Sequence, residues 1–421
     1  MSYRYIIVFT IIIAVCTALD LYTWFALKRT LTRPYQTFFK WFIPLSTILF
    51  FVGFGLNILR GSQGVHNANY FLNILTGFTF GIFIAKLIIA VPFILEDIVR
   101  YVTFLIKKIG VSKEEVNLAE RRNFVRNIAL AAGAIPLSGA LYAITFGKYN
   151  FQVKRRKYHF KNLPKSFDGL KIVHFTDFHA GSFDDERAVK KGLQLINEQN
   201  PDIVLFTGDL VNNRATEAEP YIKYLKTIKA RVGKYAILGN HDYGEYMPFS
   251  SEEEKLENFN KLTSIFKEIG FKLLRNDHIV LGTEKDNIIL GGVENWGNSP
   301  FPQYGDLDKT FENTDSQTFK ILMSHDPDHW DAKILSYKKR IDLTLSGHTH
   351  GAQFGISIPN WKWSPVKYRY KRWLGRYENE GKYLYVSKGF GFLGFPGRIG
   401  MSPEIVVHEL YSGSEKLVTK S

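Results

Sequence analysis

Residues 171–179 read KIVHFTDFH, and residues 202–209 read DIVLFTGD. Each stretch is a short apolar run followed by a carboxylate, Asp177 in the first and Asp209 in the second, and residues 184–199 between them have the polar pattern of a surface helix. This order predicts two parallel strands joined by a crossover helix. Side chains that follow such strands meet at one edge of the sheet, where α/β proteins build their sites.

The same alternation continues along the second half of the chain. Repeated strand–helix units predict a largely parallel sheet covered by helices. Further helices are predicted at 217–230 and 252–269, and further strands at 234–238, 271–274, 279–281, 288–292, 320–323 and 341–345.

Five of these strands are followed by metal-ligand types of side chain. The turns are Asp177-Phe178-His179, Gly208-Asp209, Gly239-Asn240-His241-Asp242, His325 and Gly347-His348-Thr349-His350. A single histidine after a strand is usually a structural group, but five such turns need another explanation. Burying these polar groups without partners is costly, and a shared cation removes that cost.

The composition of this set indicates the metal. The ligand atoms are oxygen and nitrogen, since the one cysteine, Cys16, lies in an apolar run and leaves neither a cysteine site nor an intrachain disulfide. Such ligands suit Mn, Fe or Zn. Seven candidates are too many for one ion, so the sequence predicts two divalent transition-metal ions that share a carboxylate. Paired ions about 3.5–4 Å apart clamp the attacking and leaving oxygens of a displacement at phosphorus.

The first 147 residues have a different character. Four apolar runs, at 5–27, 41–59, 70–95 and 128–146, each have the roughly 17–25 residues that a membrane span requires. We therefore expect an α-helical transmembrane region of about four spans. Asp20 and Lys86 lie inside these runs, where snorkelling or a contact between helices would account for them.

Basic residues in the loops predict the orientation. The first and third loops are rich in Lys and Arg, whereas the second holds only Arg60. The first and third loops are therefore expected in the cytoplasm and the domain after the fourth span outside it. The cluster KRRK at 154–157 favours the opposite orientation. Residues 121–126, RRNFVR, resemble a twin-arginine export signal, and a plain basic flank of the span is the alternative.

The motif order D-x-H, G-D, G-N-H-D, H and G-H-T-H resembles that of the calcineurin-like metallophosphoesterases, over about residues 171–410. The resemblance implies two mixed β-sheets sandwiched between helices. It implies that His241 faces the phosphate and protonates or stabilises the leaving oxygen, with Asp242 orienting it. It also implies a first metal on Asp177, His179 and His350, a second on Asn240, His325 and His348, and Asp209 as the bridge.

The resemblance and the composition together suggest a domain plan. We expect a transmembrane anchor region at 1–147, a basic connector at 148–170, the metallophosphoesterase domain at 171–412 and a tail at 413–421. Residues 389–405 resemble the ending of bacterial membrane-anchored phosphodiesterases of the same superfamily. An aromatic and basic stretch at 361–376 suits a lipid interface or an anionic substrate, with a solvated loop as the alternative.

These observations predict a hydrolase of phosphoric esters. The net charge of +14 suits nucleic acid, anionic lipid or phosphorylated substrates, and the membrane anchor disfavours a nuclease. We expect a phosphorylated small molecule or lipid-linked compound as substrate, membrane lipids as partners and no nucleic acid. One alternative is a UDP-2,3-diacylglucosamine pyrophosphohydrolase, whose substrate is made in the cytoplasm. Another is a non-catalytic membrane transporter or sensor with a metal-binding domain, against which the presence of His241 argues.

Overall fold

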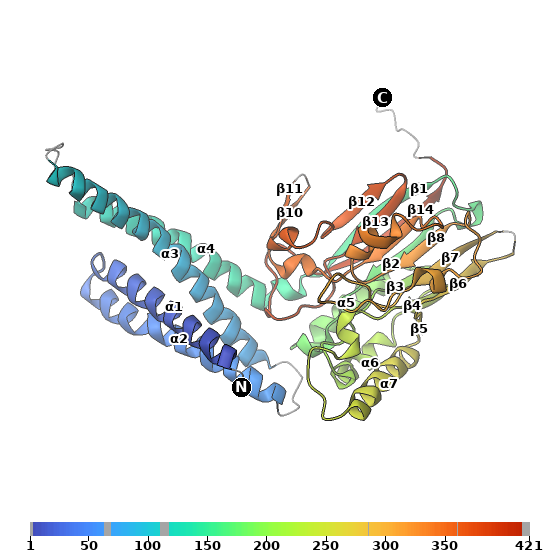
Figure 1. Ribbon diagram of the computed structural model, residues 1–421, viewed down its shortest axis with the longest axis horizontal. Helices are drawn as coiled ribbons and strands as arrows, with labels where there is room; N and C mark the ends of the chain where they lie inside the picture. The colour runs from blue at the N-terminus through green and yellow to red at the C-terminus, as the bar shows by residue number, and fades with distance from the viewer. Residues whose placement is uncertain (1–2, 63–68, 110–117, 285, 360, 415–421) are drawn as a thin grey trace. The chain divides into compact units, whose positions relative to one another are not determined.

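A computed structural model describes residues 3–62, 69–109, 118–284, 286–359 and 361–414 (Figure 1). The chain divides into two compact units, a helical one up to Thr145 and a second one that begins at Phe146. The described residues of the helical unit form four helices, α1 (Tyr3–Lys28), α2 (Arg33–Ser62), α3 (Tyr70–Lys108) and α4 (Leu118–Thr145). Each is long and apolar enough to cross a membrane, which confirms the four predicted apolar helices.

Polar contacts join the first three of these helices. Lys86 of α3 donates to Asp20 Oδ1 of α1 at 2.7 Å. The same ammonium donates to the backbone oxygen of Ile43 at 2.7 Å and to Thr47 Oγ1 at 2.8 Å, both on α2. Contact between helices therefore explains both ionisable groups inside the apolar runs.

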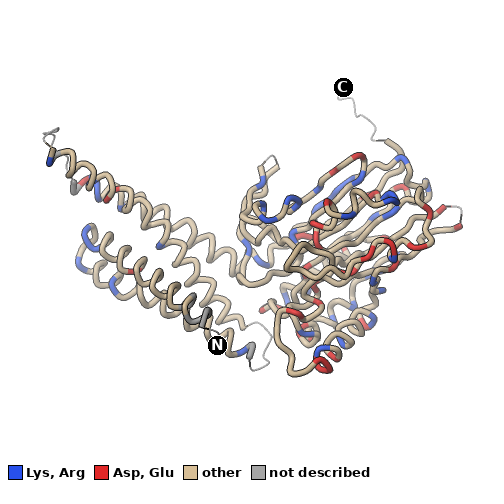
Figure 2. Tube along the Cα trace, viewed as in Figure 1, with Lys and Arg blue, Asp and Glu red and all other residues tan. Residues whose placement is uncertain are grey.

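The paired arginines of α4 have partners on α3. Arg121 contacts Glu96 at 2.9 Å, and Arg122 contacts Glu96 at 3.1 Å and Asp97 at 3.4 Å. These ion pairs give both arginines a structural role, while the export signal stays a prediction. Most Lys and Arg residues of the unit gather at the end where α1 meets α2 and α3 approaches α4 (Figure 2). Which side of the membrane this end faces also stays a prediction.

The second unit contains two six-stranded mixed sheets, which confirms the predicted fold class. The first sheet has the order β1 (Gln152–Phe160), β14 (Glu404–Ser412), β2 (Leu170–Phe175), β3 (Ile203–Phe206), β4 (Gly233–Ala236) and β5 (Lys272–Leu273). The second has the order β12 (Gly375–Asn379), β13 (Lys382–Val386), β9 (Leu343–Ser346), β8 (Lys320–Met323), β7 (Asn287–Gly292) and β6 (Asp277–Gly282). Strands β2 to β5 are parallel, as are β7, β8, β9 and β13.

Alternating side chains along the strands build the layers. On β2, Ile172 points into the core between the two sheets, where it joins Leu290 of β7. Its neighbour Val173 points the other way and packs with Phe266. The helices on that outer face are α5 (Glu186–Glu198), α6 (Glu219–Leu225) and α7 (Glu252–Glu268), drawn together in Figure 1. The helix predicted at 217–230 is shorter in the structure, where α6 ends at Leu225.

Strand β1 lies within residues that the sequence treats as a connector. It pairs in parallel with β14 along its whole length, from Gln152 opposite Glu404 to Phe160 opposite Ser412. The outer boundaries of the catalytic domain stay a prediction. A small antiparallel hairpin, β10 (Ile356–Ile358) and β11 (Trp361–Trp363), stands apart from both sheets (Figure 1).

Candidate metal centre

All the predicted ligand residues follow the carboxyl ends of strands. Asp177 and His179 come after β2, Asp209 after β3, and Asn240 after β4. His325 follows β8, and His348 and His350 follow β9. The two sheets face each other across their shared core, so their strand ends deliver these side chains to one place.

The backbone beneath these side chains adopts an uncommon conformation. Five of the ligand candidates have positive φ angles between 50° and 71°, namely Asp177, His179, Asp209, His348 and His350. Residues other than glycine rarely adopt this region, and each such residue costs about 1–3 kcal/mol. Strain concentrated on chemically active side chains is typical of a functional site.

Close approach of a carboxylate to the backbone requires glycine at two positions in these turns. A Cβ on Gly239 would collide with the Asp209 carboxylate, and a Cβ on Gly347 would collide with that of Asp177. Both carboxylates therefore lie directly against neighbouring backbone, which fixes their position.

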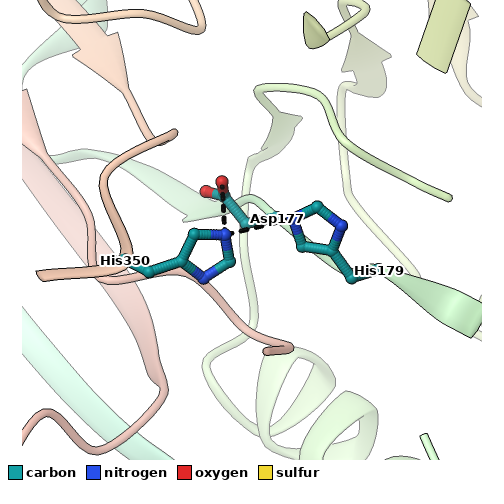
Figure 3. A group of neighbouring side chains, drawn as sticks. All are labelled: Asp177, His179 and His350. Atoms are coloured by element: carbon teal, nitrogen blue, oxygen red, sulfur yellow. Dashed lines mark hydrogen bonds and ion pairs between the residues drawn. The ribbon is translucent and has the colours of Figure 1, made fainter. Parts of the chain in front are cut away.

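The first group comprises Asp177, His179 and His350, whose potential ligand atoms all lie within 4.8 Å of one another. The His179 and His350 Nε2 atoms are 3.0 Å apart, and His350 Nε2 is 3.3 Å from Asp177 Oδ1. Figure 3 shows the three side chains converging on a common point. The other ring nitrogen of His179, Nδ1, is 3.0 Å from Asn212 Oδ1, so its Nε2 lone pair faces the group.

The second group comprises Asp209, His325 and His348, again within 4.8 Å. His325 Nδ1 donates to the backbone oxygen of Thr207 at 2.7 Å, and its Nε2 lies 3.2 Å from Asp209 Oδ2. Asn240 joins this group, because its Oδ1 is 2.8 Å from His348 Nδ1. Asp209 Oδ2 is also 3.5 Å from His179 Nε2. This one oxygen therefore reaches both groups.

The surroundings of His325 Nε2 show whether cations fit this site. His325 Nε2 is fully buried and has no hydrogen-bond partner among the described residues. Because Nδ1 donates to Thr207, Nε2 is the ring nitrogen that faces the Asp209 carboxylate, and it offers a lone pair to a cation once its own proton is displaced. A divalent cation satisfies both the lone pair and the negative charge, so the residues fit two metal ions.

The electrostatics of the site agree with this assignment. Burial lowers the pKa of His179 to about 3, which keeps its ring neutral as a metal ligand must be. Burial opposes protonation of His325 too, but the Asp209 carboxylate raises the pKa of that ring to about 10. Although burial works against it, His325 in turn holds the pKa of Asp209 well below its usual range. The proton on His325 is the one that a cation would displace.

His241 lies beside both groups. Its backbone N–H donates to Asp209 Oδ1 at 2.9 Å, and its ring centre is 5.0 Å from that of His179. Its Nδ1 donates to the backbone oxygen of Asn212 at 2.8 Å, which leaves Nε2 as the atom available to a substrate.

Asp242 differs from the expectation that it orients His241. Its buried carboxylate accepts backbone N–H groups of Gly239, Asp209, Leu210 and Val211. It therefore fixes the turn that carries Asp209, and the Asn212 carbonyl orients the His241 ring. The physical reason is that the tight turns leave four backbone N–H groups without other acceptors near the buried Asp242 carboxylate, and the carboxylate accepts from these groups and not from the His241 ring.

Three further residues support the site and were not found from the sequence. Asn212 holds both His179 and His241. The Tyr370 hydroxyl lies 2.7 Å from His348 Nε2, and the Tyr246 hydroxyl accepts from Asn240 Nδ2 at 2.9 Å. Asn212 could have been suspected, because a ligand histidine needs a partner for its second nitrogen. No motif spacing points to Tyr370 or Tyr246.

Comparison with known proteins agrees with this geometry. Residues 170–352 match the family described as calcineurin-like phosphoesterase. An uncharacterized metallophosphoesterase of Bacillus subtilis, YkuE, is 30% identical over 313 residues, covering 69% of this chain and 98% of that protein. The chain belongs to the calcineurin-like metallophosphoesterase family. It is therefore a hydrolase of phosphoric ester bonds.

Residues 3–148 match a second family, described as probable calcineurin-like phosphoesterase, transmembrane domain. The metallophosphoesterase is thus an integral membrane protein with four predicted spans. A transmembrane protein with metallophosphoesterase domain from Danio rerio is 30% identical over 58% of this chain and 54% of its own length. The UDP-2,3-diacylglucosamine pyrophosphatase LpxG of Chlamydia muridarum is 27% identical over 54% of this chain and 81% of that protein.

Proposed function

We propose that this membrane-anchored metallophosphoesterase uses two transition-metal ions to hydrolyse a phosphate ester or pyrophosphate of a membrane or envelope compound. The observation that carries the proposal is the position of Asp209 Oδ2, within 3.2 Å of His325 Nε2 and 3.5 Å of His179 Nε2. A carboxylate oxygen placed between two histidine groups is suited to bridge two neighbouring cations.

Each residue then has a role. Asp177, His179 and His350 would hold the first ion, Asn240, His325 and His348 the second, and Asp209 would bridge them. When bound, the ions supply positive charge for the phosphate oxygens and lower the pKa of a water molecule. His241 would hold a proton at Nε2 for the leaving oxygen. Asp242 would keep the Asp209 turn in place.

A pyrophosphate bond in a nucleotide-linked diacylglucosamine is the second candidate substrate, supported by the similarity to LpxG. That compound is made on the cytoplasmic side, whereas the loop charges favour an external catalytic domain. A phosphorylated compound outside the cytoplasm therefore remains the first choice. A non-catalytic sensor is disfavoured, because His241 is positioned beside the metal groups without being needed as a ligand.

Purified full-length protein loaded with Mn²⁺ tests the proposal. We expect hydrolysis of bis-p-nitrophenyl phosphate or p-nitrophenyl phosphate, about two metal ions per chain, and loss of both after chelation. A panel of phospholipids and nucleotide sugars then identifies the substrate class. His159→Ala, a histidine of β1 outside the site, is the matched control and should keep metal and activity. At most one ion per chain in active protein contradicts the two-metal proposal.

A further inference from the structure

The residues that follow the last span contact side chains that lie close to the metal-ligand candidates in the fold. Lys148, three residues after the end of α4, donates to Asp184 Oδ2 at 2.6 Å, and the Tyr149 hydroxyl donates to Asp184 Oδ1 at 2.8 Å. Asp184 follows the turn that carries His179. The Phe151 ring centre is 4.4 Å from that of Phe390, whose backbone N–H bonds to Thr176, next to Asp177.

The length of the connecting chain limits how far these contacts can lie from the end of the last span. From Thr145 to Lys148 the chain can extend over at most about 10 Å. The turn after His179 therefore lies a short distance from the point where the chain leaves the membrane. The catalytic domain is connected to its anchor at the end that carries the metal site.

A hairpin beside the site presents an apolar face. In β10 and β11, Ile356 pairs with Trp363 and Ile358 with Trp361, so these four side chains lie on one face of the ribbon. Ile356, Ile358 and Trp361 are 39%, 54% and 53% exposed. Ser357 and Lys362 form the other cross-strand pair, on the opposite face. The hairpin is therefore amphipathic, and three of the four side chains on its apolar face are exposed, whereas Trp363 is partly buried beside Phe354.

The base of the hairpin lies at the same end of the domain. Gly355 N–H donates to the Ile399 backbone oxygen at 3.0 Å, and Ile399 N–H donates to Gln353, three residues after His350. Four residues further on, the Pro403 backbone oxygen accepts from Gln152, the first residue of β1. Those four residues span at most about 14 Å. The hairpin, the metal site and the entry of the chain from the membrane therefore share one end of the domain.

We propose that the apolar face of the β10–β11 hairpin inserts into the lipid interface, so that the metal site receives phosphoesters that carry acyl chains in the bilayer. Tryptophan beside lysine is the composition that membrane interfaces favour. Four helices of the same chain are long and apolar enough to cross a membrane, so the catalytic domain is tethered to a bilayer. An exposed apolar ribbon would otherwise be a site of aggregation. The statement about the substrate rests on the proposed function, whereas the insertion of the hairpin does not.

Lipid quenching tests the insertion directly. Full-length Cys16→Ser protein, carrying Ile358→Cys labelled with a small fluorophore, is placed in phosphatidylglycerol and phosphatidylethanolamine vesicles with nitroxide-labelled acyl chains. The label should lose most of its emission. Val280→Cys is the matched control, because Val280 is 57% exposed on β6 and belongs to another hairpin. Its emission should stay unchanged. An unquenched label at position 358 overturns the proposal. The hairpin would then face water, a second copy of the chain or the chain's own helices, and not lipid.

Kinetics test the statement about the substrate. The double variant Ile358→Ser, Trp361→Ser should lower the ratio of the rate on a vesicle-embedded phosphoester to the rate on p-nitrophenyl phosphate about tenfold or more. Val280→Ser should leave that ratio unchanged. Equal losses of rate on both substrates would mean that the hairpin supports the metal site itself. That result would overturn the statement about the substrate. If the parent protein hydrolyses neither ester, the proposed function fails, and the quenching result still decides the insertion.

Discussion

Asp209 Oδ2 lies 3.2 Å from His325 Nε2, and both side chains are buried. A carboxylate in this position can serve both metal groups. Asp209→Asn removes the charge that both ions share, so we expect the variant to lose both metals together, with activity. Elemental analysis of the purified variant checks this. Retention of one ion at full occupancy would show that Asp209 serves only one group.

The affinity of the site for metal should fall as the pH is lowered. Without metal, the Asp209 carboxylate raises the pKa of His325 to about 10, so a proton occupies the ring at neutral pH. The ion must displace that proton, and lower pH favours the proton. Affinity should therefore fall from about pH 8 to about pH 6, and calorimetry in two buffers of different ionisation enthalpy should detect proton release. Equal affinity at both pH values would contradict the pairing of His325 with Asp209.

His241→Ala separates metal binding from catalysis. The ring approaches the site but belongs to neither ligand group, so the variant should keep both metals. General acid groups typically contribute about 10²–10⁴-fold. The rate loss should be large for alkyl phosphates and smaller for p-nitrophenyl esters, whose leaving group needs no proton. Loss of metal would make His241 a ligand, and equal rate losses would make it an electrostatic contact with no proton to give.

The basic first and third loops predict that the catalytic domain lies outside the cytoplasm. We expect a fusion of alkaline phosphatase after Leu410 to be active and a fusion of green fluorescent protein there to be dark. A third fusion in the second loop, after Arg60, should report the same side as the domain. Fluorescence after Leu410, with a silent phosphatase, would place the catalytic domain in the cytoplasm and favour the diacylglucosamine substrate.

The Lys148–Asp184 pair should be important for stability. Both side chains are 1% exposed, and burial lowers the pKa of Lys148. Removing one partner of a buried ion pair typically costs about 3–5 kcal/mol. Asp184→Ala should therefore lower the Tm clearly. The exposed pair Lys338–Asp308 is the control, and Asp308→Ala should leave the Tm unchanged. Similar Tm values for the two variants would show that the first pair is not needed to hold the segment after α4.

The sequence predicted the strands that precede ligands because each combines an apolar run with a polar turn. Strand β1 was not predicted, because Lys154, Arg155, Arg156 and Lys157 do not alternate with apolar residues. Its inward face instead uses long basic side chains against aromatic rings, such as Arg156 over Tyr385. Strand β14 was missed as well, since its neighbours β1 and β2 are distant in sequence.

The sequence predicted the ligand candidates of the site more completely than the residues that hold those ligands in place. Motif spacing identified the six Asp and His residues that the structure brings together in two groups, because the strand ends that carry them are local features. Asp242 and Tyr370 were different. The partners of a carboxylate depend on which backbone donors the fold leaves open, and the contact between Tyr370 and His348 joins residues from separate loops. Neither is a property of a short stretch of sequence.

The place of β14 between β1 and β2 bears on the order of events during synthesis. Strand β1, the first strand after the membrane anchor in the sequence, cannot pair until the ribosome has made residues 404–412, because Gln152 pairs with Glu404 and Phe160 with Ser412. Until then β1 has no partner in the first sheet, and β2 has an open edge. The catalytic domain therefore matures only after translation passes this point, and a polypeptide released before Glu404 cannot close the sheet that carries Asp177 and Asp209.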